Sequence, residues 1–241
     1  FAAHMLARGT GEKTREGLAK ELDAIAGSAG GFSGWNSVGA SGKFLSRYFD
    51  NGFEIFSDII QNPAFPEEEI QKLKKETLDV IRSQEDNLPS YTFKLLYKTL
   101  YETHPYGMPV VGVPETVAAF TAEDLKTLHE RFFDPERMVL VIAGDIDTDY
   151  ALLKAKKLFK DFKGNRLSLT PPKPPQALQN IRSTGASRKK AQSNIGIGLI
   201  GTTIGHEDSY GLKVLMEGLS GQGGRRFLRL RRARRSSPSS S

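Results

Sequence analysis

Apolar side chains recur along this chain mostly three and four residues apart, the spacing of a helix with one buried face. Leu18, Leu22 and Ile25 follow Thr14, a residue type that caps helix starts, and Gly27 then supplies a stop. The same spacing predicts further helices over 51–60, from Pro66 to about Gln84, over 91–101, from Thr121 through Phe132, over 150–162 and over 208–219.

Two of these helix starts carry their own signals. Three glutamates follow Pro66, and acidic side chains are favourable at the positive end of a helix. Thr121 and Asp124 have the spacing of a capping box.

Other stretches have the pattern of strands. The apolar run Met138 to Ala143 predicts a buried strand, and Ser193 to Ile200 predicts another. The Gly- and Ser-rich stretch from Ser28 to Ser46 predicts one or two short strands with turns. Helices and strands together indicate an α+β protein.

Composition is that of an ordinary globular protein, with 38% hydrophobic and 26% charged residues among 241. No run of 18 apolar residues is present, so no membrane span is expected. The absence of cysteine excludes disulfides and thiolate metal sites.

The net charge of +6 comes from one end of the chain. Seven of the 34 Lys and Arg residues are arginines within 225–241, which leaves 27 basic residues against 28 acidic ones elsewhere. These arginines could bind nucleic acid through phosphate contacts, but few aromatic residues lie among them. We favour a solvated, disordered tail over a nucleic-acid site.

The opening residues match a metal-binding motif in part. Phe1-Ala-Ala-His4-Met-Leu-Ala-Arg-Gly-Thr resembles the end of His-x-x-Glu-His followed by Met-Leu-x-x-Gly-Thr. In that inverted zinc motif, two imidazoles one helical turn apart hold zinc and the glutamate activates a metal-bound water. Here His4 matches the second histidine, Ala3 stands at the glutamate position, and the first histidine would precede Phe1.

Several further segments resemble the insulinase and pitrilysin family of zinc peptidases, which includes the mitochondrial processing peptidases. Their order and spacing carry the resemblance, which covers residues 1 to about 231. The segments are Asn62-Pro-Ala-Phe-Pro-Glu-Glu-Glu69, His104-Pro-Tyr-Gly107, Gly112-Val-Pro-Glu-Thr-Val117, Phe120-Thr-Ala-Glu-Asp-Leu125, Val139-Leu-Val-Ile-Ala-Gly-Asp-Ile146, Tyr210-Gly-Leu-Lys-Val-Leu215 and Gly223-Gly-Arg-Arg-Phe227.

The resemblance implies a two-layer α/β sandwich in which helices pack on an antiparallel-rich sheet. It divides the chain into a first peptidase-like domain over 1–167 without its N-terminal strands, a Pro-rich linker over 168–177, the truncated start of a second homologous domain over 178–230, and an Arg/Ser tail over 231–241. The resemblance also implies that two such halves enclose a chamber in which peptides are cut, that active halves carry the zinc and that opposing halves often lack it.

The resemblance also places the third zinc ligand of active members at Val80, within Leu78-Asp-Val-Ile-Arg82. Valine has no lone pair, and Asp79 points about 100° away on a helix. We therefore expect no cofactor in this chain, although zinc is the family's metal, and no catalytic residue, with Ala3 at the general-base position.

Substrate contacts are the remaining family feature. Gly34, Trp35 and Asn36 fall where active relatives pair an edge strand with the substrate backbone, and Arg231 falls at a substrate-binding arginine. The alternative for Gly34 to Asn36 is a Gly-rich turn at an ordinary sheet edge.

The other candidate motifs favour structural explanations. His104 is expected to make a structural hydrogen bond, His129 to be half-exposed packing and His206 to lie in a solvated loop. Gly196, Gly198 and Gly201 have the spacing of a dinucleotide fingerprint but lie inside an expected strand, which argues against that use.

The sequence thus predicts a non-catalytic half or subunit of an insulinase-family metallopeptidase, which encloses peptide substrates together with an active half. The alternative is a fragment of an active zinc metalloendopeptidase. A nucleic-acid binder that uses the Arg-rich tail is the weaker third reading.

Overall fold

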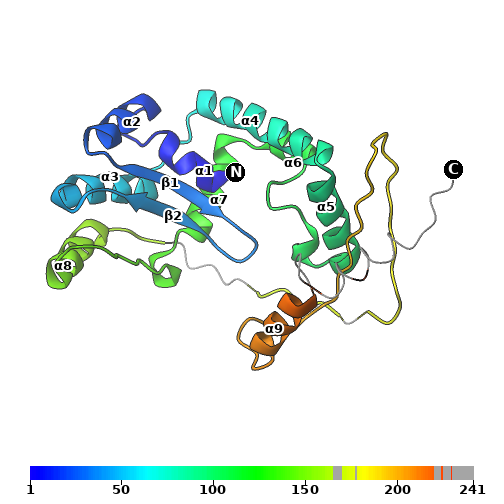
Figure 1. Cartoon of the computed structure of the whole chain (residues 1–241). Coiled ribbons are helices and arrows are strands. Elements are labelled where there is room, and N and C mark those ends of the chain that lie inside the picture. The colour runs from blue at the N-terminus through cyan, green and yellow to red at the C-terminus, as the bar shows by residue number, and fades with distance from the viewer. Residues whose placement is uncertain (165–169, 177, 220–223, 225–228, 230–241) are drawn as a thin grey trace. The chain divides into compact units, whose positions relative to one another are not determined.

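The computed structural model describes residues 1–164, 170–176, 178–219, 224 and 229, and most of its regular structure is helical (Figure 1). The chain divides into two compact units. One comprises Phe1–Gln176 with Ile181–Gly198, and the other comprises Ala177–Asn180 with Leu199–Ser241. None of the described helices combines the length and apolar character that a membrane span needs.

The longer helices of the first unit match the periodic stretches of the sequence, which confirms those predictions, whereas the two short helices Ala2–Met5 and Pro114–Ala119 were not predicted. The helices are α1 (Ala2–Met5), α2 (Arg15–Ala24), α3 (Phe49–Gln61), α4 (Glu67–Asp86), α5 (Leu88–Tyr101), α6 (Pro114–Ala119), α7 (Ala122–Phe132) and α8 (Thr148–Phe159). Short 3-10 turns are η1 (Leu6–Arg8), η2 (Ser46–Tyr48), η3 (Pro105–Gly107) and η4 (Pro135–Arg137).

The predicted helix starts are also present. The Thr14 side chain accepts a hydrogen bond from the Gly17 N–H, and Thr121 and Asp124 form a complete capping box. Pro66 was expected to be the first residue of its helix, but α4 begins one residue later at Glu67, so Pro66 occupies the N-cap position. The side chains of Thr14 and Thr121 each satisfy a backbone group that the first turn of a helix leaves without an intrahelical partner, whereas Pro66 makes no side-chain capping hydrogen bond.

The sheet is a two-stranded antiparallel hairpin of β1 (Ser28–Ser33) and β2 (Val38–Lys43), in the predicted Gly- and Ser-rich stretch. Ser33 lies opposite Val38, and Gly31 lies opposite Ala40. Because side chains alternate along a strand, Ala29, Val38 and Ala40 share one face, and all three pack against the apolar core.

The helix α1 lies against this same face at very short range. A Cβ atom on Gly31 would lie 1.8 Å from the backbone oxygen of Ala3. Only a glycine therefore allows the backbone of β1 to approach α1 this closely.

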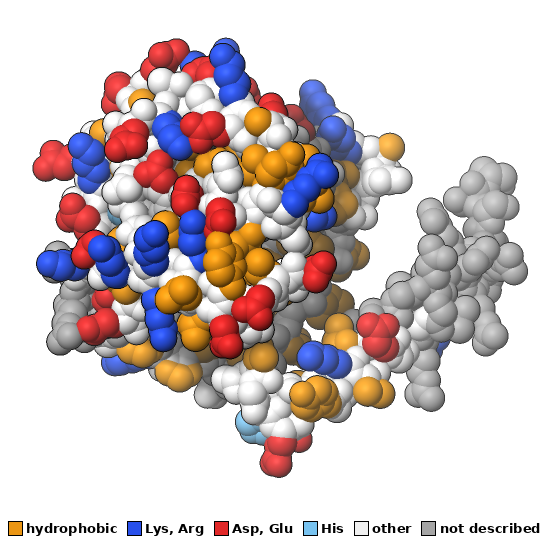
Figure 2. All heavy atoms as spheres, turned by 90° about the vertical axis from the view of Figure 1, so that its left-hand side faces the viewer, with side chains coloured by type: hydrophobic (Ala, Val, Ile, Leu, Met, Phe, Trp, Pro, Cys, Tyr) orange, Lys and Arg blue, Asp and Glu red, His pale blue; other side chains and the backbone are white. Residues whose placement is uncertain are grey.

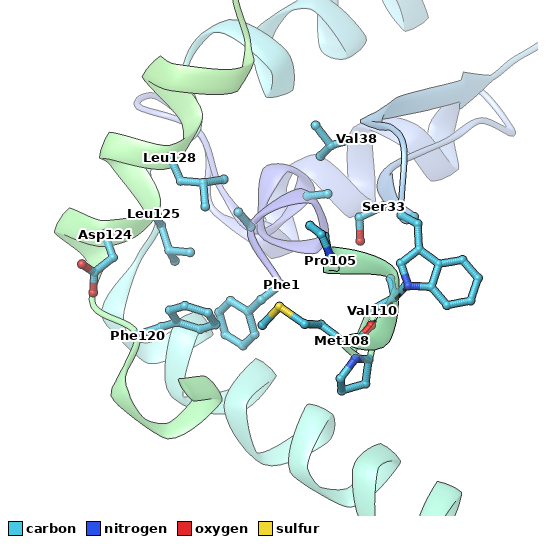
Figure 3. A pocket seen from close by; sticks show the side chains of 15 residues that line it. Phe1, Ser33, Val38, Pro105, Met108, Val110, Phe120, Asp124, Leu125 and Leu128 are labelled. Carbon is cyan, nitrogen blue, oxygen red and sulfur yellow. Dashed lines mark hydrogen bonds between the residues drawn. The ribbon is translucent and has the colours of Figure 1, made fainter. Parts of the chain in front are cut away.

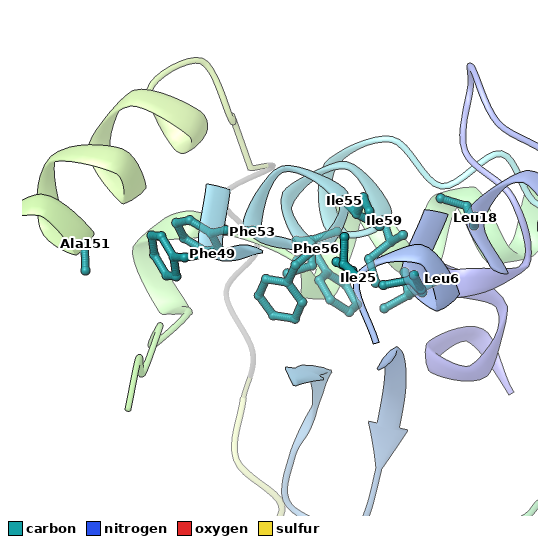
Figure 4. Packing of buried hydrophobic residues seen from close by; sticks show 12 residues of the cluster. Leu6, Leu18, Ile25, Phe49, Phe53, Ile55, Phe56, Ile59 and Ala151 are labelled. Carbon is teal, nitrogen blue, oxygen red and sulfur yellow. The ribbon is translucent and has the colours of Figure 1, made fainter. Parts of the chain in front are cut away.

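Two apolar clusters meet at the start of the chain. Leu6 belongs to the larger cluster, with α2 and the aromatic face of α3, and Figure 4 shows Phe53 and Phe56 within it. Met5 belongs to the second cluster, with Phe65, Ile70 and Leu73. Adjacent residues thus bury their side chains in different clusters, which fixes α1 and η1 from both sides.

The two longest apolar runs outside the helices are not strands, which contradicts the predictions for Met138–Ala143 and Ser193–Ile200. Both segments are extended, but within the described part of the chain neither pairs with a neighbouring strand. Val139 is 87% exposed and Ile195 is 87% exposed. An apolar run becomes a buried strand only where another backbone supplies ladder partners, and sequence periodicity does not report on that partner.

The α+β class is nevertheless correct, with a sheet smaller than the expected one. The second unit contains α9 (Ser209–Leu219), close to the predicted helix over 208–219. Tyr210 and Val214 of α9 are largely exposed within the described part of the chain.

Acidic and basic side chains are interspersed on the face drawn in Figure 2. Lys154 of α8 shows the arrangement, because its Nζ lies 3.2 Å from Asp50 and 2.6 Å from Glu54, both on α3. These pairs tie α8 to α3 at the surface, where each contributes little free energy on its own.

The close approach at Gly31 predicts an unequal response of two neighbouring glycines. Gly31→Ala should lower the free energy of unfolding by about 1–3 kcal/mol, because β1 and α1 must move apart. Gly30→Ala is the matched control, since its added Cβ meets nothing within 4 Å and its effect should stay within about 0.5 kcal/mol. Denaturant titration of the three proteins measures both values, and equal effects would contradict the packing described for α1.

Candidate functional site

The site begins at His4, on the short helix α1. Its ring is exposed, whereas Ala3 beside it is 1% exposed and offers only a methyl group. Although His4 is exposed as a residue, the covered part of its ring loses water, which lowers the pKa of His4, and the positive charge of Arg8 lowers that pKa further. The imidazole is therefore neutral near pH 7 and has a free electron pair for a ligand.

The second candidate position lies on α4. Val80 is 47% exposed and has no donor atom. The carboxylate of Asp79 next to it accepts a hydrogen bond from Arg82 at 3.1 Å, one turn along the same helix. Asp79 thus takes part in a surface ion pair of α4.

These residues do not fit a zinc ion. Of Ala3, His4 and Val80, only His4 has an electron pair to offer. Throughout the described residues, no three His, Asp or Glu side chains are grouped as a metal site requires. Catalytic zinc sites have three protein ligands, and Ala3, His4 and Val80 together supply one.

The elements of the site are instead held by an ion-pair cluster. The buried Glu69 of α4 accepts hydrogen bonds from Arg8 at 3.3 Å, Arg15 at 2.9 Å and Lys72 at 2.9 Å. Burial would raise the pKa of Glu69, but the hydrogen bonds and charges of Lys72 and Arg15 outweigh it and lower that pKa. The ionised Glu69 therefore links η1, α2 and α4.

The tip of the hairpin is also fixed. The N–H of Gly34 donates to the carbonyl of Ser37 at 2.8 Å, which closes the turn around Trp35 and Asn36. The Trp35 indole N–H donates to the carbonyl of Met108 at 3.2 Å, and the Tyr106 hydroxyl donates to the Asn36 side chain at 2.6 Å.

Aromatic rings extend this attachment from the tip to α5. The Trp35 ring lies 4.9 Å from that of Tyr97, Tyr97 stacks on Tyr101 at 6.0 Å, and Tyr101 meets Tyr106 edge-on at 5.5 Å. Tyr97 and Tyr101 are four residues apart, so α5 presents both on one side. The turn that the sequence marked as substrate-binding is thus held rigidly against α5 and η3.

A half-open cavity of about 330 Å³ lies beside this tip (Figure 3). Its walls come from α1, the turn end of the hairpin, the segment after η3 and α7. In Figure 3, Leu125 and Leu128 reach toward it from α7, while Phe1, Met108 and Phe120 surround its base. Most of the lining is apolar.

The sequence analysis did not find this cavity. Its signal is weak, because the lining residues are ordinary apolar positions from segments more than a hundred residues apart. The i, i+4 spacing of Phe93, Tyr97 and Tyr101 is a local sign of an aromatic surface on α5.

The remaining histidines are structural. His104 Nδ1 accepts a hydrogen bond from the Tyr106 N–H at 3.2 Å, as expected, and His206 lies in an exposed turn beside Asp208. His129 was predicted to be half-exposed but is buried, because α7 turns it inward to donate from Nε2 to the carbonyl of Ile60 at 2.7 Å.

Two further sequence motifs lie away from the site. Gly196 and Gly198 approach the Leu96 side chain of α5, and no helix starts directly after Gly201, so no phosphate-binding turn is formed. The predicted substrate residue Arg231 lies outside the described residues, as does nearly all of the arginine-rich tail.

Comparison with known proteins identifies two family regions. Residues 1–113 match the model described as Insulinase (Peptidase family M16), and residues 119–235 match the Peptidase M16 inactive domain. An uncharacterized zinc protease of Rickettsia felis is 30% identical over 72% of this chain and 42% of its own length. One from Bacillus subtilis is 28% identical over 92% of this chain and 53% of its own length. The chain thus spans about half the length of these relatives.

Solved structures agree on the fold. A peptidase M16 inactive domain from Pseudomonas fluorescens superposes with a TM-score of 0.66 at 21% identity, covering 73% of this chain and 44% of that one. The periplasmic protease PqqL of Escherichia coli gives a TM-score of 0.65 at 17% identity, covering 73% of this chain and 20% of that one.

The buried His129 predicts a loss of stability in mild acid. Burial lowers its pKa below the ordinary 6.5, although the Ile60 carbonyl opposes this. The unfolded chain therefore takes up the proton first, so His129 contributes fully above about pH 6.5 and loses its contribution as pH falls below that value. The slope of the unfolding free energy against pH that one histidine contributes has an upper limit of about 1.4 kcal/mol per pH unit.

Denaturant unfolding at pH 7.5 and pH 5.0 measures this effect. His129→Gln keeps an N–H donor for Ile60 but does not titrate, so its unfolding free energy should change less between the two pH values. An unchanged difference would assign the acid sensitivity to other groups.

Proposed function

Because this chain belongs to the insulinase family of M16 peptidases, we propose that it is a non-catalytic half or subunit of such a peptidase. In this proposal it closes a peptide-enclosing chamber together with an active half. The observation that carries it is the chemistry of the site, where Ala3 and Val80 lack donor atoms while α1, α4 and the hairpin stay tightly packed. The scaffold suits enclosure, and the donor set does not suit hydrolysis.

The proposal assigns peptide contact to Gly34, Trp35 and Asn36. The tip they form is anchored through Met108 and Tyr106, so it can offer a preorganised surface to an extended chain. We also propose that Arg231 contacts the substrate. We propose in addition that the chain divides into a first domain over 1–167, a linker over 168–177, the start of a second domain over 178–230 and a tail over 231–241.

The alternative is a piece of an active zinc metalloendopeptidase, a function that the names of the curated relatives suggest for those proteins. It would require a carboxylate at position 3 and a ligand at position 80. Neither Ala3 nor Val80 supplies one, which is why we favour the non-catalytic role.

We predict that the purified full chain neither retains stoichiometric zinc after dialysis nor cleaves a quenched fluorescent peptide. Ala3→Glu should change neither result, because a general base without a bound metal activates no water at this site. Metal analysis and a peptide-cleavage assay provide the test. One tightly held zinc per chain, together with chelator-sensitive cleavage, would overturn the non-catalytic assignment.

We also predict that activity appears on pairing. The partner to use is an insulinase-family chain from the same genome with an intact His-x-x-Glu-His motif and distal glutamate. The mixture should cleave the peptide faster than the partner alone, and replacing the partner's motif glutamate by glutamine should abolish cleavage. Trp35→Ala in this chain should raise KM of the mixture, with Tyr48→Ala as a control on an aromatic residue outside the tip. If the chains form no complex and cleavage is unchanged, the proposal fails.

A further inference from the structure

We propose that Lys189 and Lys190 form a processing site, at which an endopeptidase specific for basic residues cuts the chain into two polypeptides. The inference goes beyond the proposed function and does not depend on it, because it concerns a different segment of the chain.

The site lies in an exposed arm of the first unit, residues 181–198, which runs out and back beside α5 (Figure 1). Residues 181–197 are all exposed, and the whole arm lacks helix and strand. Among the described residues, the one hydrogen bond between backbone groups of the arm runs from the Lys190 N–H to the Arg188 carbonyl at 2.9 Å, which closes a tight turn around Lys189. An endopeptidase can therefore reach this backbone without unfolding any helix or strand.

The outgoing half of the arm is attached to α5 by two arginines. Arg182 pairs at 2.8 Å with Glu102, the residue that follows α5. The guanidinium of Arg188 lies 4.6 Å from the centre of the Tyr91 ring, at the opposite end of that helix. These two contacts fix the arm just before the turn.

The returning half is attached by its glycines. A Cβ atom on Gly196 would lie 3.1 Å from the Thr92 side chain, and one on Gly198 would lie 3.1 Å from the Leu96 side chain. The backbone of the arm thus packs directly on α5 on this side as well. The turn between the two attached halves is held out from the helix in a fixed place.

The side chains of Lys189 and Lys190 are available to a specificity pocket. Within the described part of the chain, neither ammonium group has a hydrogen bond or an ion pair, whereas the neighbouring Arg188 is engaged with the Tyr91 ring. Residues 183–187 before them are Ser, Thr, Gly, Ala and Ser, which are small enough to fit the other subsites of a peptidase. An acidic pocket that pairs with a lysine would therefore select this turn.

Most other lysines lie in regular structure. A lysine in a helix or a strand becomes a substrate only when that element opens locally. Twelve of the eighteen lysines are of this kind, namely Lys20, Lys43, Lys72, Lys74, Lys75, Lys94, Lys98, Lys126, Lys154, Lys156, Lys157 and Lys213.

The four remaining lysines have local obstacles. Lys173 precedes Pro174, whose ring crowds the bond to be cut. The carbonyl of Lys13 accepts a hydrogen bond from the Thr10 N–H at 2.8 Å.

The other two lie just after α8. Lys160 is the C-cap residue of that helix, and Lys163 precedes Gly164, whose backbone packs closely against Asp134. Lys189 and Lys190 are thus the pair of lysines that combines exposure with a long stretch free of regular structure.

The reaction is the addition of one water across a peptide bond. The bond between the carbonyl carbon of Lys190 and the nitrogen of Ala191 breaks, the carbon gains the hydroxyl of water and the nitrogen gains its proton. Residues 1–190 then end in a carboxyl group, and residues 191–241, which include α9, begin with an amine. Cleavage after Lys189 gives the same separation one residue earlier.

The experiment digests the full, folded chain with a trace of lysyl endopeptidase. This enzyme cuts after lysine and spares the arginine-rich residues 225–241, which contain no lysine. Intact-mass spectrometry at short times should show two fragments that meet after residue 189 or 190. We expect this cut to be at least roughly 100-fold faster than any cut within a helix, since a helix must open first.

A double variant and a single variant give the matched comparison. Lys189→Gln combined with Lys190→Gln keeps the length and polarity of the turn but removes both basic side chains, so the intact chain should disappear roughly 10-fold or more slowly. Lys163→Gln makes the same change at an exposed lysine outside the arm and should leave the rate unchanged. Circular dichroism checks that all three proteins are folded.

Several results would overturn the processing site. They are a first cut at any other lysine, equal rates for the double variant and the unaltered chain, and resistance of the folded chain at an enzyme concentration that digests the urea-unfolded chain completely. None of them concerns zinc retention or pairing with an active half, so the proposed function is tested separately.

Discussion

The contact between the Ala3 carbonyl and Gly31 is the constraint on which the arrangement of the site depends. It brings the backbones of α1 and β1 together with no side chain between them. Once α1 is fixed there, Met5 and Leu6 can enter different apolar clusters, and the turn end of the hairpin is directed toward η3 and α7. The hairpin tip, the cavity and the position of His4 all follow from this one approach.

An ion-pair cluster and apolar contacts stabilise the scaffold around His4. The buried Glu69 gathers Arg8, Arg15 and Lys72, and the apolar contacts of Met5 with Ile70 and Leu73 lie alongside. Buried charges are tolerated only where partners satisfy them, so this cluster favours one arrangement of η1, α2 and α4. Neither Ala3 nor Val80 takes part in this ion-pair cluster, so the charged contacts that hold η1, α2 and α4 together do not involve those two positions.

Local features could be predicted from the sequence, and features that depend on distant partners could not. Two helix starts could be predicted from Thr14 and from the pair Thr121 and Asp124, because a cap involves only the next three residues. Val139 gives a strand signal that fails, since a strand needs a second backbone that periodicity cannot specify. His129 was misjudged for a related reason, as its burial depends on the carbonyl of Ile60, 69 residues away. At the site, the segment around Ala3 and His4 could be compared with a known motif from the sequence, whereas the cavity depends on tertiary packing alone.

The exposed run Met138–Ala143 has a practical consequence. It is uncharged, rich in β-branched residues and without proline, and in the described part of the chain its amides and carbonyls have no ladder partner. Two molecules that meet at these segments can form main-chain hydrogen bonds with each other, in a parallel or an antiparallel arrangement of the two segments. We therefore expect this segment to favour association of the isolated polypeptide at high concentration, and a lysine in place of Val139 to oppose it.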